Sequence, residues 1–432
     1  MKEDTGFETP LERDFQNLLD RRRANSTLRN LTFNSSKTDF SSNDFLSLSK
    51  NHSLKAAFLD ELQRTSLPVG SGGSRLLDGN SAYAENLEGE IASFHGAESG
   101  LLFNSGFDAN AGFFACVPQK GDVVVYDELI HASVHDGMRM SRAEKTVPFK
   151  HNCVQDLKVV LEKQRRDQKD FMPLKGRSAH IFVAVESIYS MDGDLAPLRA
   201  IVEAVEETLP KGTGYIVVDE AHATGVIGPQ GRGLVSHLGL ERRIFARLHT
   251  FGKALACNGA IILGSRILRH YLINYARPLI YTTSMSFPML SAIRASYSLL
   301  KGGRTEPLAS KLQCLIEDLF NQLQNLRTPT FQALLTLPTE RPNSPIFSVQ
   351  LSEPKALAMF LQERGMMVRA VVPPTVPEGT SRVRICLHAG NTVEEIKDLV
   401  GAMEEWCLGH SRIGEKNNIQ MKKREKATRA RL

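Results

Sequence analysis

The sequence contains few cysteines, and none of them has the spacing of a metal site. The six cysteines lie far apart along the 432 residues, without the CxxC pairs that zinc sites use. Aspartate, glutamate and histidine show no metal-ligand spacing either. We therefore expect no metal and no disulfide framework, which favours a reducing compartment. The cysteines are Cys116, Cys153, Cys257, Cys314, Cys386 and Cys407.

Long apolar runs are also absent. No run approaches the roughly 18 residues that a transmembrane helix needs, so we expect no membrane segment. The first residues, Met1 to Asp4, are mostly charged and lack an apolar region, so we expect neither a secretory signal nor a transit peptide. Without a further signal, the expected location is the cytoplasm.

The body of the chain has no excess of positive charge. The net charge is +5, but residues 412–432 hold eight Lys or Arg against two Glu. The basic excess is thus confined to a tail with few apolar residues, which predicts a disordered segment over 411–432. A near-neutral body without interleaved aromatic and basic residues gives little reason to expect nucleic-acid binding.

Length and apolar pattern indicate an α/β protein. A chain of 432 residues is too long for one small core, and its 42% hydrophobic and 23% charged residues are typical of a globular protein. Short apolar runs alternate with helical stretches, which is the pattern of a parallel sheet covered on both faces. The predicted strands are Val123–Tyr126, Ile181–Val185, Tyr215–Val218 and Ala260–Leu263.

The pattern changes near Ser286, where long helices lead into a smaller alternation of strands and helices. We predict a helix and strand segment over 1–48, a large domain over 49–290 and a small α+β domain over 291–410. The other expected helices are Leu18–Arg23, Leu87–His95, Pro288–Leu300, Leu308–Leu326, Lys355–Arg364 and Val393–Trp406. The other expected strands are Ile346–Leu351 and Val383–Leu387, together with a short strand that runs into a turn within Asp39–Leu46.

Polar residues follow three of the predicted strands. His131, Glu186 and Asp219 each lie at or shortly after a strand end, and His222 follows Asp219. The carboxyl ends of parallel strands meet at one edge of a sheet, where ligands bind in open α/β folds. A histidine at such an edge is often structural, but its flat ring can also stack on an aromatic cofactor.

Lys253 occupies a turn within Thr250-Phe251-Gly252-Lys253-Ala254, just before the apolar run Ala260–Leu263. Lysine is uncommon beside a buried strand. A lone lysine at a loop is ordinarily a solvated surface residue. The acid Asp219, at the end of another strand, makes a reactive amine the alternative.

A Ser-Gly pair, Ser105-Gly106, is a candidate for anion binding. Glycine leaves backbone N–H groups uncovered, and such a pair at the start of a helix places several of them around an anion. This predicts a phosphate cradle at Asn104–Asn110, although an ordinary strand-to-helix turn remains an alternative. Neither GxGxxG nor GxxxxGK[ST] occurs elsewhere to compete with it.

A lysine amine, a buried aspartate, a stacking histidine and a phosphate cradle together match one chemistry, that of pyridoxal 5'-phosphate (PLP). The lysine holds the aldehyde as a Schiff base, the aspartate keeps the pyridine nitrogen protonated, and the ring accepts electrons from a carbanion. The residue set therefore predicts PLP as the cofactor.

The motifs resemble those of the α-oxoamine synthases, which are fold-type I PLP enzymes, and within them the branch that makes 8-amino-7-oxononanoate for biotin. This resemblance implies a large, mostly parallel seven-stranded sheet domain, a smaller α+β domain, and a homodimer with shared active sites. It covers about residues 18–406 and rests most on GSGGSR (Gly70–Arg75), SGFDAN, SMDGD, VDEAHATGVIGPQGRG (Val218–Gly233), TFGKA, IYTTSMS (Ile280–Ser286) and PPTVPEGTSRVR (Pro373–Arg384).

The resemblance assigns catalytic roles to Lys253 at the aldehyde, Asp219 at the pyridine nitrogen and His131 on the ring face. His222 corresponds to a histidine near the phenolic oxygen. The remaining cofactor residues that it implies are Ser105, Gly106, Phe107 and Thr250 at the phosphate, Glu186 and Ser190 in the pocket wall, and Thr283 (or its neighbour Thr282) at the phosphate of the neighbouring subunit.

Substrate residues follow from the same resemblance. Asn43 and Arg384 correspond to the pair that holds the amino-acid carboxylate, and Arg29 to an arginine near the acyl-CoA. Spacing alone cannot choose between Arg384 and Arg382, because residues two apart on a strand share a face. Relatives that use only glycine tend to have threonine at the position of Ser74, so the smaller serine leaves room for the methyl group of alanine.

The implied reaction is the decarboxylative condensation of L-alanine with pimeloyl-CoA to 8-amino-7-oxononanoate, CoA and CO2. One alternative is another α-oxoamine synthase, such as 5-aminolevulinate synthase. Another is a noncatalytic partner subunit, although Lys253 and Asp219 argue against it. The weakest is a nucleic-acid binder that acts through the basic tail.

The last three residues, Ala430-Arg431-Leu432, resemble the Ser-Lys-Leu signal that a peroxisomal import receptor reads. We therefore expect the peroxisome, where acyl-CoA is made by chain shortening. A chance ending on a charged tail is the alternative.

Overall fold

The computed structural model describes residues 9–25, 27–33, 37–170 and 178–410. Its contacts divide the chain into residues 1–37 and 38–432. In the first unit, α1 (Pro10–Ala24) contains the expected helix at Leu18–Arg23 and begins with a Thr9–Glu12 capping box. The basic tail that we predict to be disordered, with its terminal tripeptide, lies outside the described residues.

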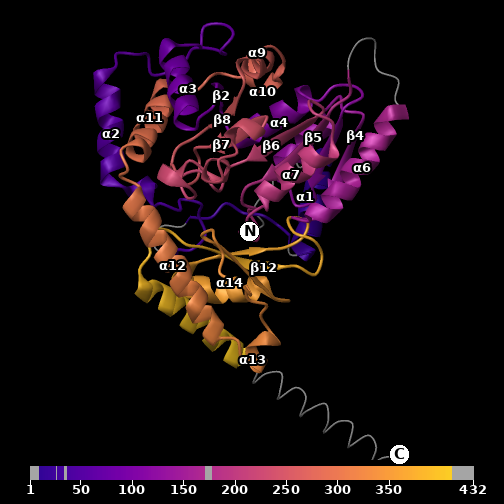
Figure 1. The fold of residues 1–432 in the computed structure, drawn as a ribbon. Helices are drawn as coiled ribbons and strands as arrows, with labels where there is room; N and C mark the ends of the chain where they lie inside the picture. Colours follow the sequence, from indigo (N-terminus) through magenta and orange to yellow (C-terminus); the bar gives the residue numbers. More distant parts are fainter. Residues whose placement is uncertain (1–8, 26, 34–36, 171–177, 411–432) are drawn as a thin grey trace, which may run out of the picture. The chain divides into compact units, whose positions relative to one another are not determined.

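The second unit contains a seven-stranded sheet in the order β2-β8-β7-β6-β5-β3-β4 (Figure 1). Every neighbouring pair is parallel except the two that involve β8. The prediction of a mostly parallel seven-stranded sheet is therefore confirmed. The strands are β2 (Ser99–Phe103), β3 (Val123–Asp127), β4 (Lys145–Phe149), β5 (Ile181–Glu186), β6 (Gly214–Asp219), β7 (Ala246–Thr250) and β8 (Ala260–Gly264).

Strand β8 corrects one expectation. The apolar pattern places Ala260–Leu263 among the parallel strands, but β8 runs antiparallel to β7 and β2. The reason is the short connection: residues 251–259 join β7 to β8 without a helix, and a parallel pair needs a crossover of a dozen or more residues. The apolar pattern missed β7 because Arg247 and His249 interrupt it, and it also missed β2 and β4.

Helices cover both faces of this sheet. One core joins alternate strand residues such as Val217 and Ile262 to α4 and α9, while Val218 belongs to a second core shared with α6 and α7. Helices α3 and α11 pack together beside α2 (Figure 1). The helices are α2 (His52–Arg64), α3 (Ala82–Phe94), α4 (Gly106–Cys116), α5 (Ala132–Arg139), α6 (Val154–Asp170), α7 (Leu198–Thr208), α8 (Leu234–His237), α9 (Arg266–Tyr275), α10 (Arg277–Ile280) and α11 (Phe287–Lys301).

After α11 the chain builds an antiparallel sheet in the order β11-β12-β9. A parallel pair of two-residue strands, β1 and β10, joins residues 38–39 to 366–367. The boundary that we place at residue 290 stays a prediction. The elements are β1 (Thr38–Asp39), α12 (Glu306–Asn325), α13 (Pro329–Gln332), β9 (Ile346–Gln350), α14 (Pro354–Glu363), β10 (Met366–Met367), β11 (Arg369–Val371), β12 (Arg382–Cys386) and a helix over 393–410.

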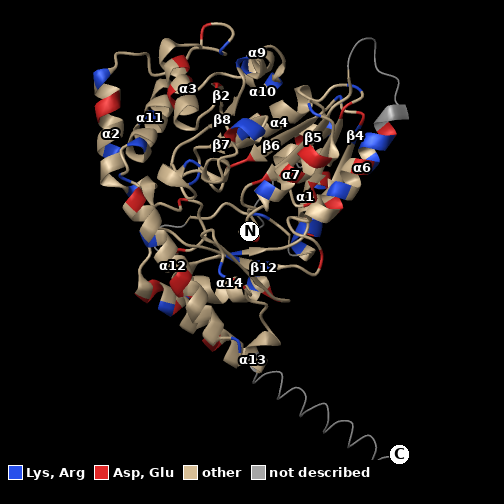
Figure 2. Ribbon diagram, viewed as in Figure 1, with Lys and Arg blue, Asp and Glu red and all other residues tan. Residues whose placement is uncertain are grey.

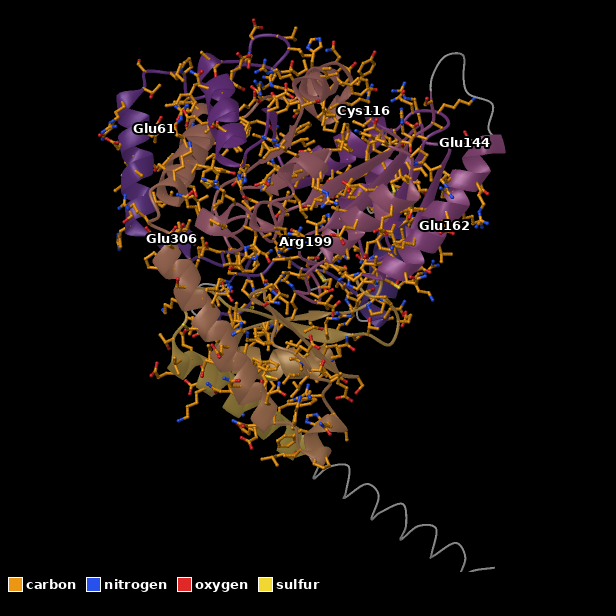
Figure 3. All side chains as sticks on the ribbon, viewed as in Figure 1. Glu61, Cys116, Glu144, Glu162, Arg199 and Glu306 are labelled. Carbon is orange, nitrogen blue, oxygen red and sulfur yellow. The ribbon has the colours of Figure 1, made fainter. Side chains whose placement is uncertain are left out.

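Lysine, arginine, aspartate and glutamate mix along the exposed helices α2, α6 and α12 (Figure 2). All six cysteines are free, and burial raises the pKa of Cys116, at the end of α4 (Figure 3), to about 12. Among the described residues, no helix is long and apolar enough to cross a membrane. Within the same part of the chain, no group of three His, Cys, Asp or Glu side chains is placed to hold a metal ion.

Candidate active site

Lys253 lies in the loop that joins β7 to β8. The loop is held by backbone bonds from Phe251 N to Gly259 O (2.9 Å) and from Cys257 N to Phe251 O (2.8 Å). Gly259 has φ +100°, and a Cβ there would lie 2.5 Å from Cε of Met285. Only glycine fits this position without displacing its neighbours. The loop that carries the lysine is therefore tightly constrained.

Burial lowers the pKa of Lys253 to about 8, against the opposing charges of Asp219 and Glu186, and nearby Arg384 lowers it further. A lysine with an ordinary pKa would be almost fully protonated near neutral pH. Lys253 instead presents an appreciable fraction of neutral amine, which is the form that attacks an aldehyde.

Asp219 ends β6 and is buried beside α4. Its carboxylate accepts hydrogen bonds from Asn110 Nδ2 (2.8 Å) and from the backbone N–H of Ala221 (2.9 Å). Asn110 also donates to Ser133 Oγ (3.0 Å). Sequence reasoning selected neither Asn110 nor Ser133 as functional. Asn110 lies inside the SGFDAN motif, but nothing in the chain's spacing shows that its amide meets Asp219.

His131 precedes α5 and caps it. Its Nδ1 accepts from the backbone N–H of Ser133 (3.2 Å) and lies 2.7 Å from Ser133 Oγ. Burial lowers the pKa of His131, which the charge of Asp219 opposes. The ring is therefore neutral, with its proton on Nε2. A chain of hydrogen bonds thus runs from His131 through Ser133 and Asn110 to Asp219.

The predicted phosphate cradle lies at the start of α4. Ser105 caps the helix by accepting from the backbone N–H of Asp108 (3.0 Å). The first backbone N–H groups of a helix have no partner within it, and the helix dipole favours an anion there. A Cβ on Gly106 would lie 3.5 Å from Thr250 Oγ1, so the hydroxyl of Thr250 adjoins the same turn. The ring of Phe107 lies 6.5 Å from that of His131.

Glu186 and His222 are buried with unsatisfied polar atoms. Glu186 Oε1 and His222 Nδ1 have no hydrogen-bond partner among the described residues. Burial, with the charge of Asp219, raises the pKa of Glu186 well above its usual value. Burial, with the charge of Lys253, lowers that of His222. Buried polar groups normally have partners, so these two indicate room for a polar ligand beside Lys253.

The donor set around Lys253 fits PLP. The neutral amine suits the aldehyde, the carboxylate of Asp219 suits a protonated pyridine nitrogen, and the flat neutral ring of His131 suits an aromatic face. The start of α4 with Thr250 suits the phosphate. The structure therefore brings together most of the cofactor residues expected from the sequence.

Arg384, on β12, belongs to the same site. Its Nε donates to the carbonyl of Ser190 (2.6 Å), and its Nη2 donates to Asn43 Oδ1 (3.0 Å). Arg382 is instead paired with Asp192 and bonded to the carbonyl of Thr380 (2.9 Å). The neutral partners of Arg384 leave its charge available for a carboxylate. The structure thus distinguishes two arginines that strand spacing could not.

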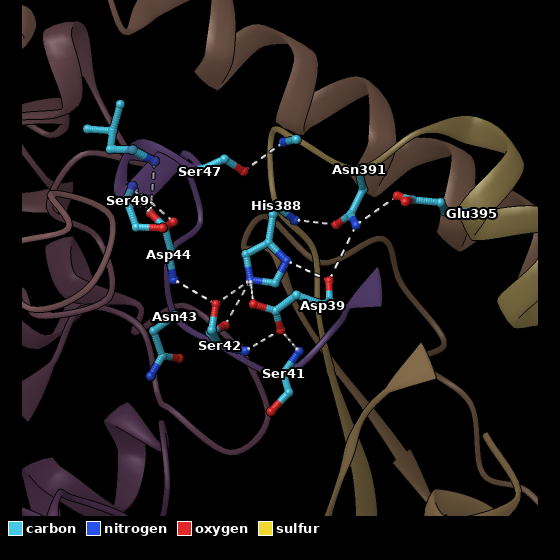
Figure 4. A network of polar contacts seen from close by, with 12 residues as sticks. Asp39, Ser41, Ser42, Asn43, Asp44, Ser47, Ser49, His388, Asn391 and Glu395 are labelled. Carbon is cyan, nitrogen blue, oxygen red and sulfur yellow. Dashed lines mark hydrogen bonds and ion pairs between the residues drawn. The ribbon is translucent and has the colours of Figure 1, made fainter. Parts of the chain in front are cut away.

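The segment that carries Asn43 is fixed by a polar network (Figure 4). His388 Nδ1 lies 2.9 Å from the carbonyl of Asp39, and its Nε2 lies 3.0 Å from Ser42 Oγ. The backbone N–H of Gly390 donates to Ser47 Oγ (2.8 Å). These bonds hold residues 39–47 against residues 388–391 and so fix the position of Asn43.

Three predicted residues are not shown at this cluster. The backbone carbonyl of Ser74 accepts hydrogen bonds from the backbone N–H groups of Leu77 and Gly79. Thr283 is exposed, and its carbonyl accepts a hydrogen bond from Asn104 Nδ2 (2.8 Å). Arg29 is exposed within residues 1–37 and is not placed relative to the other residues. Their roles stay predictions.

Comparison with known proteins agrees with this site. The model of the aminotransferase class I and II family matches residues 35–403. The 8-amino-7-oxononanoate synthase of Emericella nidulans is 56% identical over 86% of this chain and 90% of its own. Aminoacyl transferase sphA of Aspergillus fumigatus is 40% identical over 90% of this chain and 86% of its own.

Among solved structures, a serine palmitoyltransferase that contains PLP matches with a TM-score of 0.76 and 25% identity, over 91% of this chain and 97% of that chain. Family model, relatives and fold thus agree on a PLP-dependent enzyme. The chain belongs to the aminotransferase class I and II family and, within it, to the PLP-dependent α-oxoamine synthases, which are acyltransferases.

Proposed function

We propose that the protein condenses L-alanine with pimeloyl-CoA and releases CoA, CO2 and 8-amino-7-oxononanoate. The observation that carries this proposal is Arg384, an arginine without a carboxylate partner beside the amine of Lys253. An amino acid held there by its carboxylate has its α-carbon near a base. The 56% identical relative named 8-amino-7-oxononanoate synthase supports the choice of acyl group and a role in the biotin pathway.

When bound, PLP supplies an aldehyde for the amino acid and a ring that accepts electrons from the α-carbon. The chain's own residues do the rest. The neutral fraction of Lys253 accepts the α-proton at Nζ and returns a proton later. Asp219 would hold the proton of the pyridine nitrogen, and Asn110 fixes the orientation of that carboxylate. Arg384 and Asn43 orient the substrate carboxylate.

Ser74 bears on the choice of amino acid. We propose that its small side chain leaves room for the methyl group of alanine. A methyl group is worth only about 1–3 kcal/mol of discrimination, so alanine is preferred without strict exclusion of glycine or serine.

The test is a CoA-release assay that crosses alanine, glycine and serine with acyl-CoAs of graded length. The highest kcat/KM is expected for alanine with pimeloyl-CoA. A clear preference for palmitoyl-CoA, or for glycine with succinyl-CoA, would reassign the enzyme within its family. We also propose that the enzyme is a homodimer in which Thr283 reaches the phosphate of the neighbouring subunit. The mass of the same preparation in solution tests the dimer.

Replacing Arg384 with lysine should raise the KM for the amino acid about 10-fold or more, because lysine cannot form the two-point contact of a guanidinium with a carboxylate. The KM for the acyl-CoA should stay near the wild-type value. Arg382→Lys is the matched control on the same strand, since lysine there can still pair with Asp192. Equal effects of the two substitutions would contradict the assignment of Arg384.

We further propose that Ala430-Arg431-Leu432 directs the enzyme to the peroxisome. This tripeptide lies outside the described residues, and the proposal rests on its sequence. A fluorescent protein fused after Leu432 should leave the enzyme in the cytosol, while the same fusion at the amino end should be imported. If the two fusions are found in the same location, the proposal is rejected.

A further inference from the structure

A cavity of 870 Å³ opens beside the candidate active site. One wall is formed by residues 128–132, which include His131, and a second by residues 189–192, which include Ser190. Residues 373–378 form a third wall together with Arg382. Two of these walls carry residues of the expected cofactor site, so the cavity adjoins that site.

One histidine, His151, connects the first two walls. Its Nδ1 lies 2.8 Å from Asp127 Oδ1, and its Nε2 lies 2.7 Å from Asp194 Oδ2. Asp127 ends β3, directly before the first wall, and Asp194 is the second residue after the end of the second wall. His151 itself lies in the connection between β4 and α6, outside the cavity lining.

The side chain of His151 is charged. Burial opposes the charge, but the hydrogen bonds and charges of Asp127 and Asp194 outweigh it and raise the pKa of His151 to about 10. An imidazolium has two N–H donors, and an ionised carboxylate only accepts, so each ring nitrogen donates to one aspartate. Charge-assisted bonds of this kind are stronger than neutral ones, which suits a connection between two loops.

Neighbouring contacts support the same connection. The backbone N–H of His151 donates to Glu128 Oε1 (2.9 Å), and that of Asn152 donates to Asp127 Oδ2 (2.8 Å). The ring of Tyr189 meets the His151 ring edge-on at 4.5 Å. Both walls are thus bonded to residues 151–152. Asn152 Nδ2 also donates to Asp194 Oδ2 (2.5 Å), while the ring of His151 supplies the charged bonds to both Asp127 and Asp194.

The second wall is also bonded on its other side. Ser190 accepts from Arg384, and Asp192 pairs with Arg382. A Cβ on Gly193 would collide with the carbonyl of Ile346, so the loop lies directly against β9. Loss of the His151 ring would leave Asp194 bonded to the neutral amide of Asn152 (2.5 Å) on its side toward the first wall. The connection between the two walls would then lose its charged bonds, which would widen the cavity rather than unfold the loop.

We propose that His151 is a positioning residue that sets the width of this cavity, and thereby the length of acyl chain that the enzyme accepts. This proposal deepens the proposed function, because it assumes that the cavity receives the acyl thioester. His151 touches neither the cofactor site nor the substrate. It acts through Asp127 and Asp194 on the two walls.

The test compares acyl chain lengths in His151→Gln and Asp194→Asn. For each variant, the kcat/KM for palmitoyl-CoA is divided by that for the best short acyl-CoA. This ratio should rise about 10-fold over wild type, because loss of a distant positioning contact can shift geometry enough to change rates by up to about 100-fold. A smaller folded fraction lowers both values equally and leaves the ratio unchanged. His52→Gln, at an exposed position on α2, is the matched control.

Equilibrium binding of unreactive acyl-CoA thioethers of the same two lengths gives a second ratio that needs no turnover. The affinity for the longer thioether should improve relative to the shorter one in both variants. If both ratios stay within about twofold of wild type in the folded holoenzyme, His151 does not set the width. If wild type prefers another acyl group, the proposed function fails while the thioether ratio still tests His151.

Discussion

Lys253→Ala is expected to lose acyl-CoA-dependent turnover by more than about 10⁴-fold, since one amine serves as both nucleophile and base. The reason lies in its position, because the amine of Lys253 is buried beside the charges of Asp219 and Glu186. The protein should still fold and bind PLP, because the start of α4, Asp219 and His131 remain. CoA release and the absorbance of bound cofactor measure the two properties separately.

Borohydride reduction makes this prediction sharper. It should fix the cofactor covalently to wild type and to Lys50→Ala, an exposed control, but not to Lys253→Ala. A small added amine should restore part of the turnover in Lys253→Ala by replacing the missing base. Retained activity, or covalent fixation in Lys253→Ala, would refute the role of this lysine. A noncatalytic subunit would show no fixation even as wild type.

Asp219→Asn is expected to lower kcat by about 10²–10³-fold, the usual cost of removing one preorganised electrostatic partner. Asparagine keeps the shape of the side chain and can still accept from Asn110. It lacks the charge that holds a proton on the pyridine nitrogen, so electrons leave the α-carbon less readily. The charge of Asp219 also raises the pKa of Lys253, so that pKa should fall further below its present value of about 8.

Steady-state kinetics over pH 6–9 measures both effects of Asp219→Asn. The KM for the amino acid should change little, because Arg384 and Asn43 are untouched. Asp60→Asn, on the exposed surface of α2, is the control for loss of one carboxylate. A kcat within twofold of wild type would mean that Asp219 does not act on the cofactor.

The sequence indicated the candidate catalytic residues more readily than the residues that hold them in place. Lys253, Asp219 and His131 stand at strand ends or in a turn beside a strand, and such positions are visible in the order of apolar and polar residues. Asn110 and Ser133 act across helix α4 and the start of α5, and only tertiary packing brings them to Asp219 and His131. No local pattern carries that information.

Long-range contacts also decided what spacing left open. Arg382 and Arg384 share a face of β12, and the difference between them is Asp192, which comes from a distant loop. Asn43 meets Arg384 across a separation of 341 residues. Strand β7 stayed hidden because Arg247 and His249 break its apolar run, although all five residues of the strand are buried. Burial of charged and polar side chains depends on the fold and cannot be predicted from composition.

The close approach of Gly259 to Met285 limits which residues can replace Gly259 in this enzyme family. The loop that carries Lys253 shares its space with the segment just before α11, and at Gly259 both the positive φ and the nearby carbonyl of Phe103 (3.0 Å) exclude a larger residue even if residue 285 were smaller. Position 259 should therefore stay glycine whichever residue stands at 285. The loop that carries Lys253 thus constrains residues outside the predicted cofactor site.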